Sequence, residues 1–181
     1  MTFQPTVDLV CLGDSITQKF EWSDAFPGIQ VANRGISSDT TLGMLSRVDS
    51  VVALSPRYIS LMAGINDLLS CTPEETIVNY RTLLTALRQH LPNTQIIVTS
   101  VLPVSKSHSI PAENIIALNG MLKQLCEEFG ITYLDLFEEF ADEIHNLKPE
   151  YAIDLVHLSP QGYALWLSYL IPALYSEFPG K

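Results

Sequence analysis

Short apolar stretches alternate with longer segments of helical spacing along most of this chain. The short stretches are rich in β-branched residues and end at turn-forming residues, as buried strands do. We expect strands at residues 7–12, 29–32, 58–62, 95–101 and 131–134, and helices at 40–54, 72–90, 111–129 and 159–170. Strands joined by helical crossovers lie parallel and are covered on both faces. The alternation therefore predicts an α/β fold, a three-layer α/β/α sandwich around about five parallel strands.

Several of the expected helices carry recognisable boundary signals. Thr72 can cap the second helix, and Glu75 stands where a capping box requires an acid. Pro73 suits the first helical position. Gly130 is expected to end the third helix, and Pro172 to end the last one.

The charge balance and the cysteines exclude several classes of protein. The chain of 181 residues has 20 acidic and 10 basic side chains, a formal charge of −10, and the basic ones form no cluster. Because phosphate binding needs a basic face, we expect no nucleic-acid partner. Cys11, Cys71 and Cys126 are odd in number and far apart, which disfavours a disulfide framework and structural zinc. Cys11 is expected to be a small buried apolar residue.

The sequence has no repeat, low-complexity tract or linker. We therefore expect a single domain over residues 1–181, and no apolar run is long enough for an integral membrane segment. The stretch from Met1 to Pro5 has no basic residue before an apolar block, so we expect no signal peptide and a cytoplasmic location. The sequence makes no prediction of oligomeric state.

A serine directly follows the first expected strand. The apolar stretch stops at Gly13, and Asp14 and Ser15 follow in what reads as a tight turn at the carboxyl edge of the sheet. Ligands of open parallel sheets bind at that edge. Gly35 and Asn66 come just after the second and third strands, so they are expected there too. We predict that Ser15 is a nucleophile in a site formed by these strand ends.

Ser15 needs a general base, because a free serine hydroxyl is a poor nucleophile at neutral pH. His157 lies three residues after Asp154 and directly before a well-capped helix. At that spacing the carboxylate can fix the tautomer of the imidazole and stabilise the imidazolium, while the other ring nitrogen accepts the serine proton. We predict His157 as the base and Asp154 as its partner.

The other three histidines have different expected places. His145 belongs to a second Asp-x-x-His, within an acidic segment at 137–150 that we expect to be a solvated surface. His90 falls at a helix end, where a histidine often interacts with the last carbonyls. His108 lies in the loop after the fourth strand and could line the pocket.

An acyl-transfer site also needs hydrogen-bond donors for the oxyanion. The candidates are the backbone N–H of Ser15, the backbone N–H of Gly35 and the side-chain amide of Asn66. Gly35 has no side chain to block the approach of a substrate. The alternative is that Gly35 and Asn66 only form turns.

Four blocks of the sequence together resemble the SGNH (GDSL-like) hydrolase superfamily. They are Gly13-Asp14-Ser15, Asn33-x-Gly35, Gly64-x-Asn66-Asp67 and Asp154-x-x-His157. The resemblance extends from residue 8 to about 165 and implies a flavodoxin-like sheet and a serine esterase or lipase. It implies that Ser15 is nucleophile and oxyanion donor and that Gly35 and Asn66 complete the oxyanion hole. It also implies that Asp154 orients His157, which acts as base and then as acid.

Two residues depart from the pattern of that family. Ser38 stands where relatives often carry a second glycine, and Leu155 follows the acid where glycine is frequent. We expect neither to touch a catalytic position, although Ser38 affects the shape of the acyl pocket.

The predicted reaction is hydrolysis of a small carboxylic ester through an acyl-serine intermediate. We expect no metal or organic cofactor, and short acyl groups such as acetyl on a sugar or small alcohol. Phe20, Trp22 and Phe26 could wall a small apolar pocket, or simply pack as a surface loop.

Other functions fit the same residues. A lysophospholipase, a thioesterase or an O-acyltransferase would use the same serine. A non-catalytic flavodoxin-like module would use the Gly-Asp-Ser turn to bind an anion. A metal enzyme would use Asp154, His157 and His108 as ligands.

Overall fold

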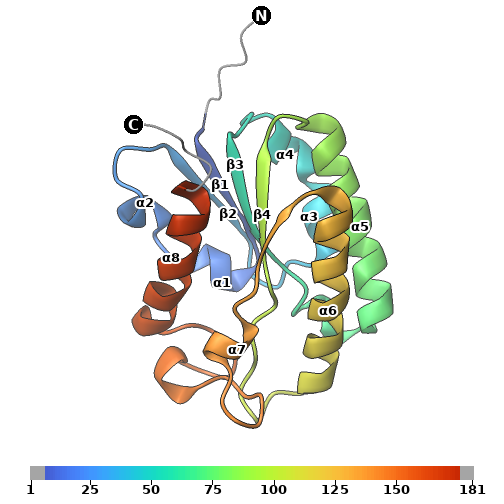
Figure 1. Ribbon diagram of the computed structural model, residues 1–181, viewed down its shortest axis with the longest axis vertical. Coiled ribbons are helices and arrows are strands. Elements are labelled where there is room, and N and C mark those ends of the chain that lie inside the picture. Colours follow the sequence, from blue (N-terminus) through green and yellow to red (C-terminus); the bar gives the residue numbers. More distant parts are fainter. Residues whose placement is uncertain (1–6, 176–181) are drawn as a thin grey trace, which may run out of the picture.

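Five parallel strands form one sheet at the centre of the molecule. The computed structural model describes residues 7–175, so the stretch from Met1 to Pro5 lies outside the described residues. The strands lie in the order β2-β1-β3-β4-β5 (Figure 1). Their bounds are β1 Leu9–Gly13, β2 Val31–Gly35, β3 Tyr58–Met62, β4 Gln95–Thr99 and β5 Thr132–Leu134. The predicted α/β fold and flavodoxin-like strand order are confirmed.

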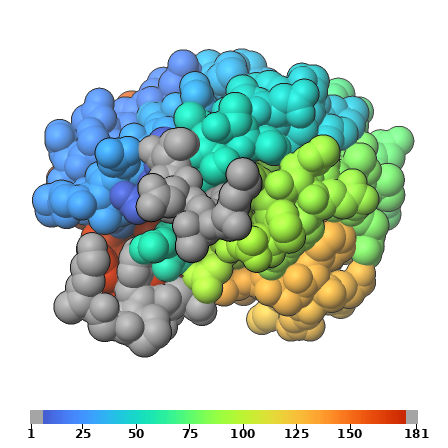
Figure 2. Space-filling view, turned by 90° about the horizontal axis from the view of Figure 1, so that it is seen from above, coloured from blue at the N-terminus to red at the C-terminus, as the bar shows by residue number. Residues whose placement is uncertain are grey.

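Helices cover both faces of this sheet and make the three layers (Figure 1). One face carries α3 Thr41–Ser46, α4 Val48–Val52, α5 Pro73–His90 and α6 Ala112–Phe129. The other face carries α2 Trp22–Ala25 and α8 Pro160–Tyr175. Figure 2 shows the end of the molecule where the strands begin, with the green and orange chain of α5 and α6 along one side. No helix between residues 7 and 175 is long and apolar enough to cross a membrane.

The pleat of the strands explains why both faces are covered. Side chains alternate between the faces of a strand. On β1, Val10 and Leu12 are buried with the apolar side chains of α5 and α6, whereas Leu9 and Cys11 are buried with those of α2 and α8. Cys11 is therefore the small buried residue that the sequence predicts.

The short elements all follow strand ends or long loops. They are the helices α1 Ser15–Gln18 and α7 Phe137–Phe140, and the 3-10 turns η1 Asp67–Leu69 and η2 Pro149–Tyr151. The expectation of a solvated surface at 137–150 is wrong in part. Phe140 and Leu147 belong to the buried cluster beneath α8, because the segment folds back under that helix, whereas His145 is exposed as expected.

The helix boundaries follow the sequence signals in two cases and depart from them in one. Thr72 and Glu75 form the predicted capping box of α5, and Gly130 ends α6 with a φ of 58°. Pro172 does not end α8, which continues to Tyr175. Proline removes one backbone hydrogen bond, but the buried Leu170 and Leu174 hold the turns on either side of it.

The helix expected at 40–54 is split at Arg47 into α3 and α4. Arg47 adopts φ −116° and ψ 16°, outside the helical region. Its guanidinium reaches back to the ends of β1 and β2, donating to the carbonyls of Gly13 (3.4 Å) and Arg34 (2.9 Å). The break therefore follows from a long-range contact that the local sequence does not reveal.

Candidate active site

Ser15 is held by a tight turn between β1 and α1. The Asp14 carboxylate accepts the N–H of Ile16 at 2.9 Å and so caps α1, whose first residue is Ser15. A side chain at Gly13 would overlap the Thr17 side chain and the Met62 carbonyl. Gly13 and Asp14 thus form the turn itself, which presents Ser15 at the carboxyl end of β1.

Three side chains brace α1 by donating hydrogen bonds to its carbonyl groups. Asn33 Nδ2 and Trp22 Nε1 donate to the Thr17 carbonyl at 3.2 and 2.8 Å. The Tyr163 hydroxyl donates to the Ile16 carbonyl at 2.6 Å. These bonds satisfy carbonyls that a short helix leaves free, and they fix Ser15 relative to β2 and α8.

The aromatic residues after α1 do not line a pocket beside Ser15. Trp22 and Phe26 are buried against α8, and Phe20 stacks on Tyr163 with ring centroids 4.4 Å apart. None of the three lines the cavity that contains Ser15. Beside Ser15 the three residues pack into the core instead of walling a pocket, and Phe26 also lines a separate cavity at the other end of the sheet.

Ser15, His157 and Asp154 form a connected chain of side chains. His157 Nε2 lies 2.9 Å from Ser15 Oγ, and His157 Nδ1 lies 2.7 Å from Asp154 Oδ2. Asp154 Oδ1 accepts the backbone N–H groups of Val156 at 2.9 Å and His157 at 2.8 Å. The structure therefore brings together all three residues of the predicted triad.

The Asp154 carboxyl remains ionised over a wide pH range. Partial desolvation raises its pKa. The hydrogen bonds from the two backbone N–H groups and from the His157 ring outweigh this effect and lower the pKa to about 2. The carboxylate can therefore hold the His157 Nδ1 proton and favour the tautomer whose Nε2 accepts a proton from Ser15.

Asn66 is aimed by the loop that follows β2. Its Nδ2 donates to the Asp39 carbonyl at 3.0 Å, which leaves one of the two amide protons for another acceptor. The backbone N–H and hydroxyl of Thr41 both donate to the buried Asp67 carboxylate. These contacts tie the loops after β2 and β3 together, and Asn66 lines the same cavity as Ser15.

Gly35 does not reach this cavity. Its N–H donates to Asn33 Oδ1 at 2.9 Å, and a side chain at Gly35 would overlap the backbone of Gln18. Gly35 is required for the close approach of β2 to α1, which agrees with the turn-forming alternative. Its N–H is already engaged, so the structure does not support Gly35 as an oxyanion donor.

Ser38, which was not expected to touch a catalytic position, lines the cavity. Its φ of 63° lies in the left-handed region that favours glycine. Its backbone N–H has no hydrogen-bond partner among the described residues. The only sequence signal was that relatives often carry glycine here, where a left-handed backbone costs nothing.

The cavity beside Ser15 has a volume of about 210 Å³. Its lining comprises Ser15, Lys19, Ser37, Ser38, Ile65, Asn66, Leu69, His108, Val156 and His157. The prediction that His108 lines the pocket is confirmed. A cavity of about 390 Å³ lies at the other end of the sheet, where it is lined by Leu9 and Tyr58, the first residues of β1 and β3.

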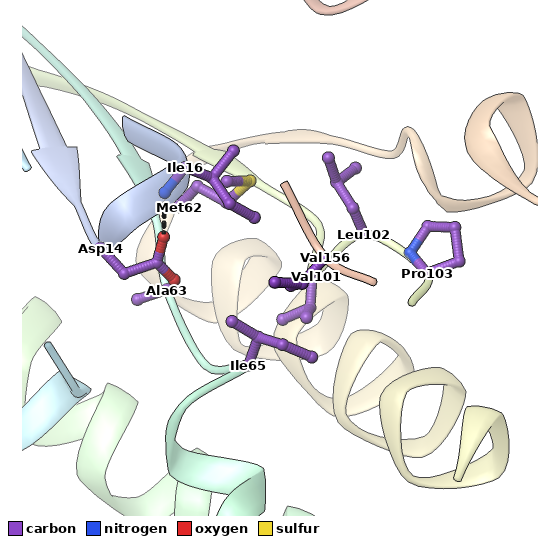
Figure 3. Close-up of a pocket in the computed structure, with 9 residues that line it drawn as sticks. All are labelled: Asp14, Ile16, Met62, Ala63, Ile65, Val101, Leu102, Pro103 and Val156. Atoms are coloured by element: carbon purple, nitrogen blue, oxygen red, sulfur yellow. Dashed lines mark hydrogen bonds between the residues drawn. The ribbon is translucent and has the colours of Figure 1, made fainter. Parts of the chain in front are cut away.

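A much smaller apolar cavity adjoins the one beside Ser15 (Figure 3). Ile65 and Val156 line both, and the small one has a volume of about 10 Å³. The carboxyl of Asp14 lies at its edge, with Oδ1 bonded to Ile16 and Oδ2 without a partner among the described residues. Burial, with a smaller contribution from Asp39 and Asp67, raises the pKa of Asp14 to about 7.

The described residues contain no group of three or more His, Cys, Asp or Glu side chains placed to hold a metal ion. Asp154, His157 and His108 do not form such a group.

Comparisons with known proteins agree with this arrangement. A family model described as GDSL-like Lipase/Acylhydrolase matches residues 11–165. A search of curated proteins found no match.

Solved structures share the fold over nearly the whole chain. A Streptococcus pneumonia protein provisionally assigned as a platelet activating factor is 25% identical, with a TM-score of 0.85 over 93% of this chain and 84% of that one. A GDSL-like lipase from Bacteroides thetaiotaomicron is 23% identical, with a TM-score of 0.83 over 95% and 89%. An acetyl-xylooligosaccharide esterase from Geobacillus Stearmophilus, solved as a variant, is 23% identical, with a TM-score of 0.73 over 100% and 98%.

Proposed function

The chain belongs to the GDSL-like lipase/acylhydrolase (SGNH hydrolase) family, and from that premise we propose that it is a serine esterase for small carboxylic esters. The observation that carries the proposal is the connected chain from Asp154 Oδ2 through the His157 ring to Ser15 Oγ, with contacts of 2.7 and 2.9 Å. A module that only binds an anion at the Gly-Asp-Ser turn has no use for a base aligned on the serine hydroxyl.

In the proposed reaction, Ser15 Oγ attacks the ester carbonyl carbon and passes its proton to His157 Nε2. Asp154 stabilises the imidazolium that forms. When the tetrahedral intermediate collapses, the bond to the alcohol oxygen breaks and His157 gives its proton to that oxygen. Water then attacks the acyl-serine with His157 again as base, which releases the acid and restores Ser15.

Three donors are available for the oxyanion in this proposal. Ser15 supplies its N–H from the first turn of α1, where backbone N–H groups have no intrahelical partner. Asn66 supplies its remaining amide proton, and Ser38 supplies its free N–H in place of Gly35. Each such donor typically contributes about a hundredfold or more to turnover.

We propose that the acyl group is short. Ile65 and Val156 bound the apolar space next to Ser15, and the small cavity beyond them holds about one water molecule. A long acyl chain would therefore have to lie along the surface, without an apolar channel to bury it.

A series of nitrophenyl esters from acetyl to dodecanoyl tests the proposal. We expect kcat/KM to be highest for the shortest acyl groups and Ser15→Ala to abolish hydrolysis. A steady rise toward long chains would overturn the short-acyl proposal, and equal hydrolysis by Ser15→Ala would overturn the esterase itself. Product analysis with and without a sugar acceptor shows whether the acyl group passes to water, as proposed, or to an alcohol.

A further inference from the structure

The cavity beside Ser15 contains a positive charge and no carboxylate. Among the described residues that line it, Lys19 carries a positive charge and none is Asp or Glu. This is unexpected in a chain with a formal charge of −10. Lys19 therefore places a positive charge in this cavity, although the molecule as a whole is negatively charged.

Lys19 is free to bind a ligand. It follows α1 directly, one helical turn after Ser15, and its side chain is exposed. It forms no ion pair with any carboxylate between residues 7 and 175. Two acids that contact residues of the site are already engaged: Asp39 with Arg47 at 2.8 Å, and Asp154 with His157.

His108 adds a hydrogen-bond donor to the same cavity. Its Nδ1 accepts the backbone N–H of Ile110 at 3.2 Å, so the proton of the neutral ring is on Nε2. Partial burial lowers the pKa of His108, which favours this neutral form at pH 7. With the Ser38 hydroxyl, the Asn66 amide and the Lys19 ammonium, the lining is rich in donors.

We propose that the substrate is an ester that carries an anionic group, such as a carboxylate, phosphate or sulfate, and that Lys19 binds this group. The inference rests on the proposed esterase function and adds the substrate class. Because Lys19 and Ser15 share a cavity of about 210 Å³, the anionic group lies within a few bonds of the scissile ester. An exposed ion pair of this kind is worth up to about fivefold in kcat/KM, or about 1 kcal/mol.

Two matched pairs of esters test this substrate class. The first pair has the charge on the alcohol: para-acetoxybenzoate against para-acetoxybenzamide. The second has it on the acyl group: the mono-nitrophenyl ester of glutaric acid against its methyl nitrophenyl diester. The readout is the ratio of kcat/KM for the charged ester to that for the neutral one, in which general damage to the enzyme cancels.

We expect Lys19→Gln to lower this ratio by up to about fivefold in at least one pair, and Lys19→Arg to keep it. The control is Lys123→Gln, because Lys123 is an exposed lysine of α6 beside a different cavity; it should leave both ratios unchanged. Raising the salt concentration should reduce the ratio of wild type toward that of Lys19→Gln.

Equal ratios in wild type and Lys19→Gln for both pairs would overturn the anionic substrate class and leave the esterase standing. An equal drop in Lys123→Gln would also overturn it, because the effect would then come from net charge. If wild type hydrolyses none of the four esters, the proposed function is overturned, and this inference with it.

Discussion

At the level of single residues, the Asp154 carboxylate has the most demanding position, because it accepts hydrogen bonds from the His157 ring and from two backbone N–H groups. Asp154→Asn keeps the size of the side chain but can present an N–H to the ring, which favours the wrong tautomer of His157. We expect kcat/KM for a short nitrophenyl ester to fall by roughly 10⁴-fold, as in other serine triads. Activity within tenfold of wild type would contradict the role given to Asp154.

Asp14 makes a different prediction, about stability and pH. Its pKa is raised to about 7 in the folded state, from an ordinary value of 3.8. Between these values the folded state binds more protons than the unfolded state, so the free energy of unfolding falls as pH rises, by about 1.4 kcal/mol per pH unit from this group. The Asn side chain of Asp14→Asn can still accept the N–H of Ile16 and cap α1, but it has no carboxyl group to titrate.

Urea unfolding at pH 5 and pH 7 checks this. Wild type should lose more stability than Asp14→Asn between the two pH values. The same loss in both proteins would show that Asp14 does not titrate in this range.

Ser38 links a strained backbone conformation to the proposed oxyanion site. A non-glycine residue with a left-handed backbone costs about 1 kcal/mol or more. Ser38→Gly should therefore raise the free energy of unfolding by up to about 1 kcal/mol. Ser37→Gly is the matched control, since Ser37 is not among the residues with positive φ and its N–H donates to Gln18; it should destabilise. Destabilisation of similar size by both changes would contradict the account of Ser38.

At the level of elements, Arg47 connects the break between α3 and α4 to the site. Its Nε donates to Asp39 Oδ2 at 2.8 Å, and the Asp39 carbonyl in turn holds Asn66. Arg47→Met leaves a largely buried carboxylate without its partner, which typically costs about 3 kcal/mol.

Adding Asp39→Asn to Arg47→Met should recover part of that loss. A double-mutant cycle by urea unfolding measures the coupling. A coupling energy near zero would mean that the Arg47–Asp39 contact does not stabilise this loop.

Elements whose ends have local signals were predictable from the sequence. The capping box at Thr72 and the terminal Gly130 gave α5 and α6 nearly to the residue, because both signals act within one turn. The prediction that Pro172 ends the last helix was wrong, since burial of α8 outweighs the missing hydrogen bond. The break at Arg47 could not be predicted, because the partners of its side chain on β1 and β2 are distant in sequence.

The site shows the same division. Ser15, Asn66, Asp154 and His157 were expected to meet, and they do, because each lies in a recognisable sequence block at a strand end or before a helix. Gly35 was placed in the oxyanion hole because glycine lacks a side chain, yet the structure uses that property for packing against α1. The residue with the left-handed backbone conformation is Ser38 instead, and a serine in the sequence does not indicate a positive φ.

At the level of the whole molecule, strand order explains where the site lies. β2 lies on one side of β1 and β3 on the other, so the chain runs from β1 to β2 and then crosses past β1 to β3. A crevice forms where the direction reverses, at the carboxyl ends of β1 and β3. Ser15 follows β1 and Asn66 follows β3. His157, 142 residues after Ser15, comes to the same crevice from the loop before α8.

The central claim is that Ser15 is an activated nucleophile, and covalent labelling tests it most directly. Treatment with a fluorophosphonate, followed by intact-mass and peptide mass spectrometry, should give one adduct, at Ser15, that is absent in Ser15→Ala and strongly slowed in His157→Ala. No adduct on folded wild-type protein, or an adduct that persists in Ser15→Ala, would contradict the claim.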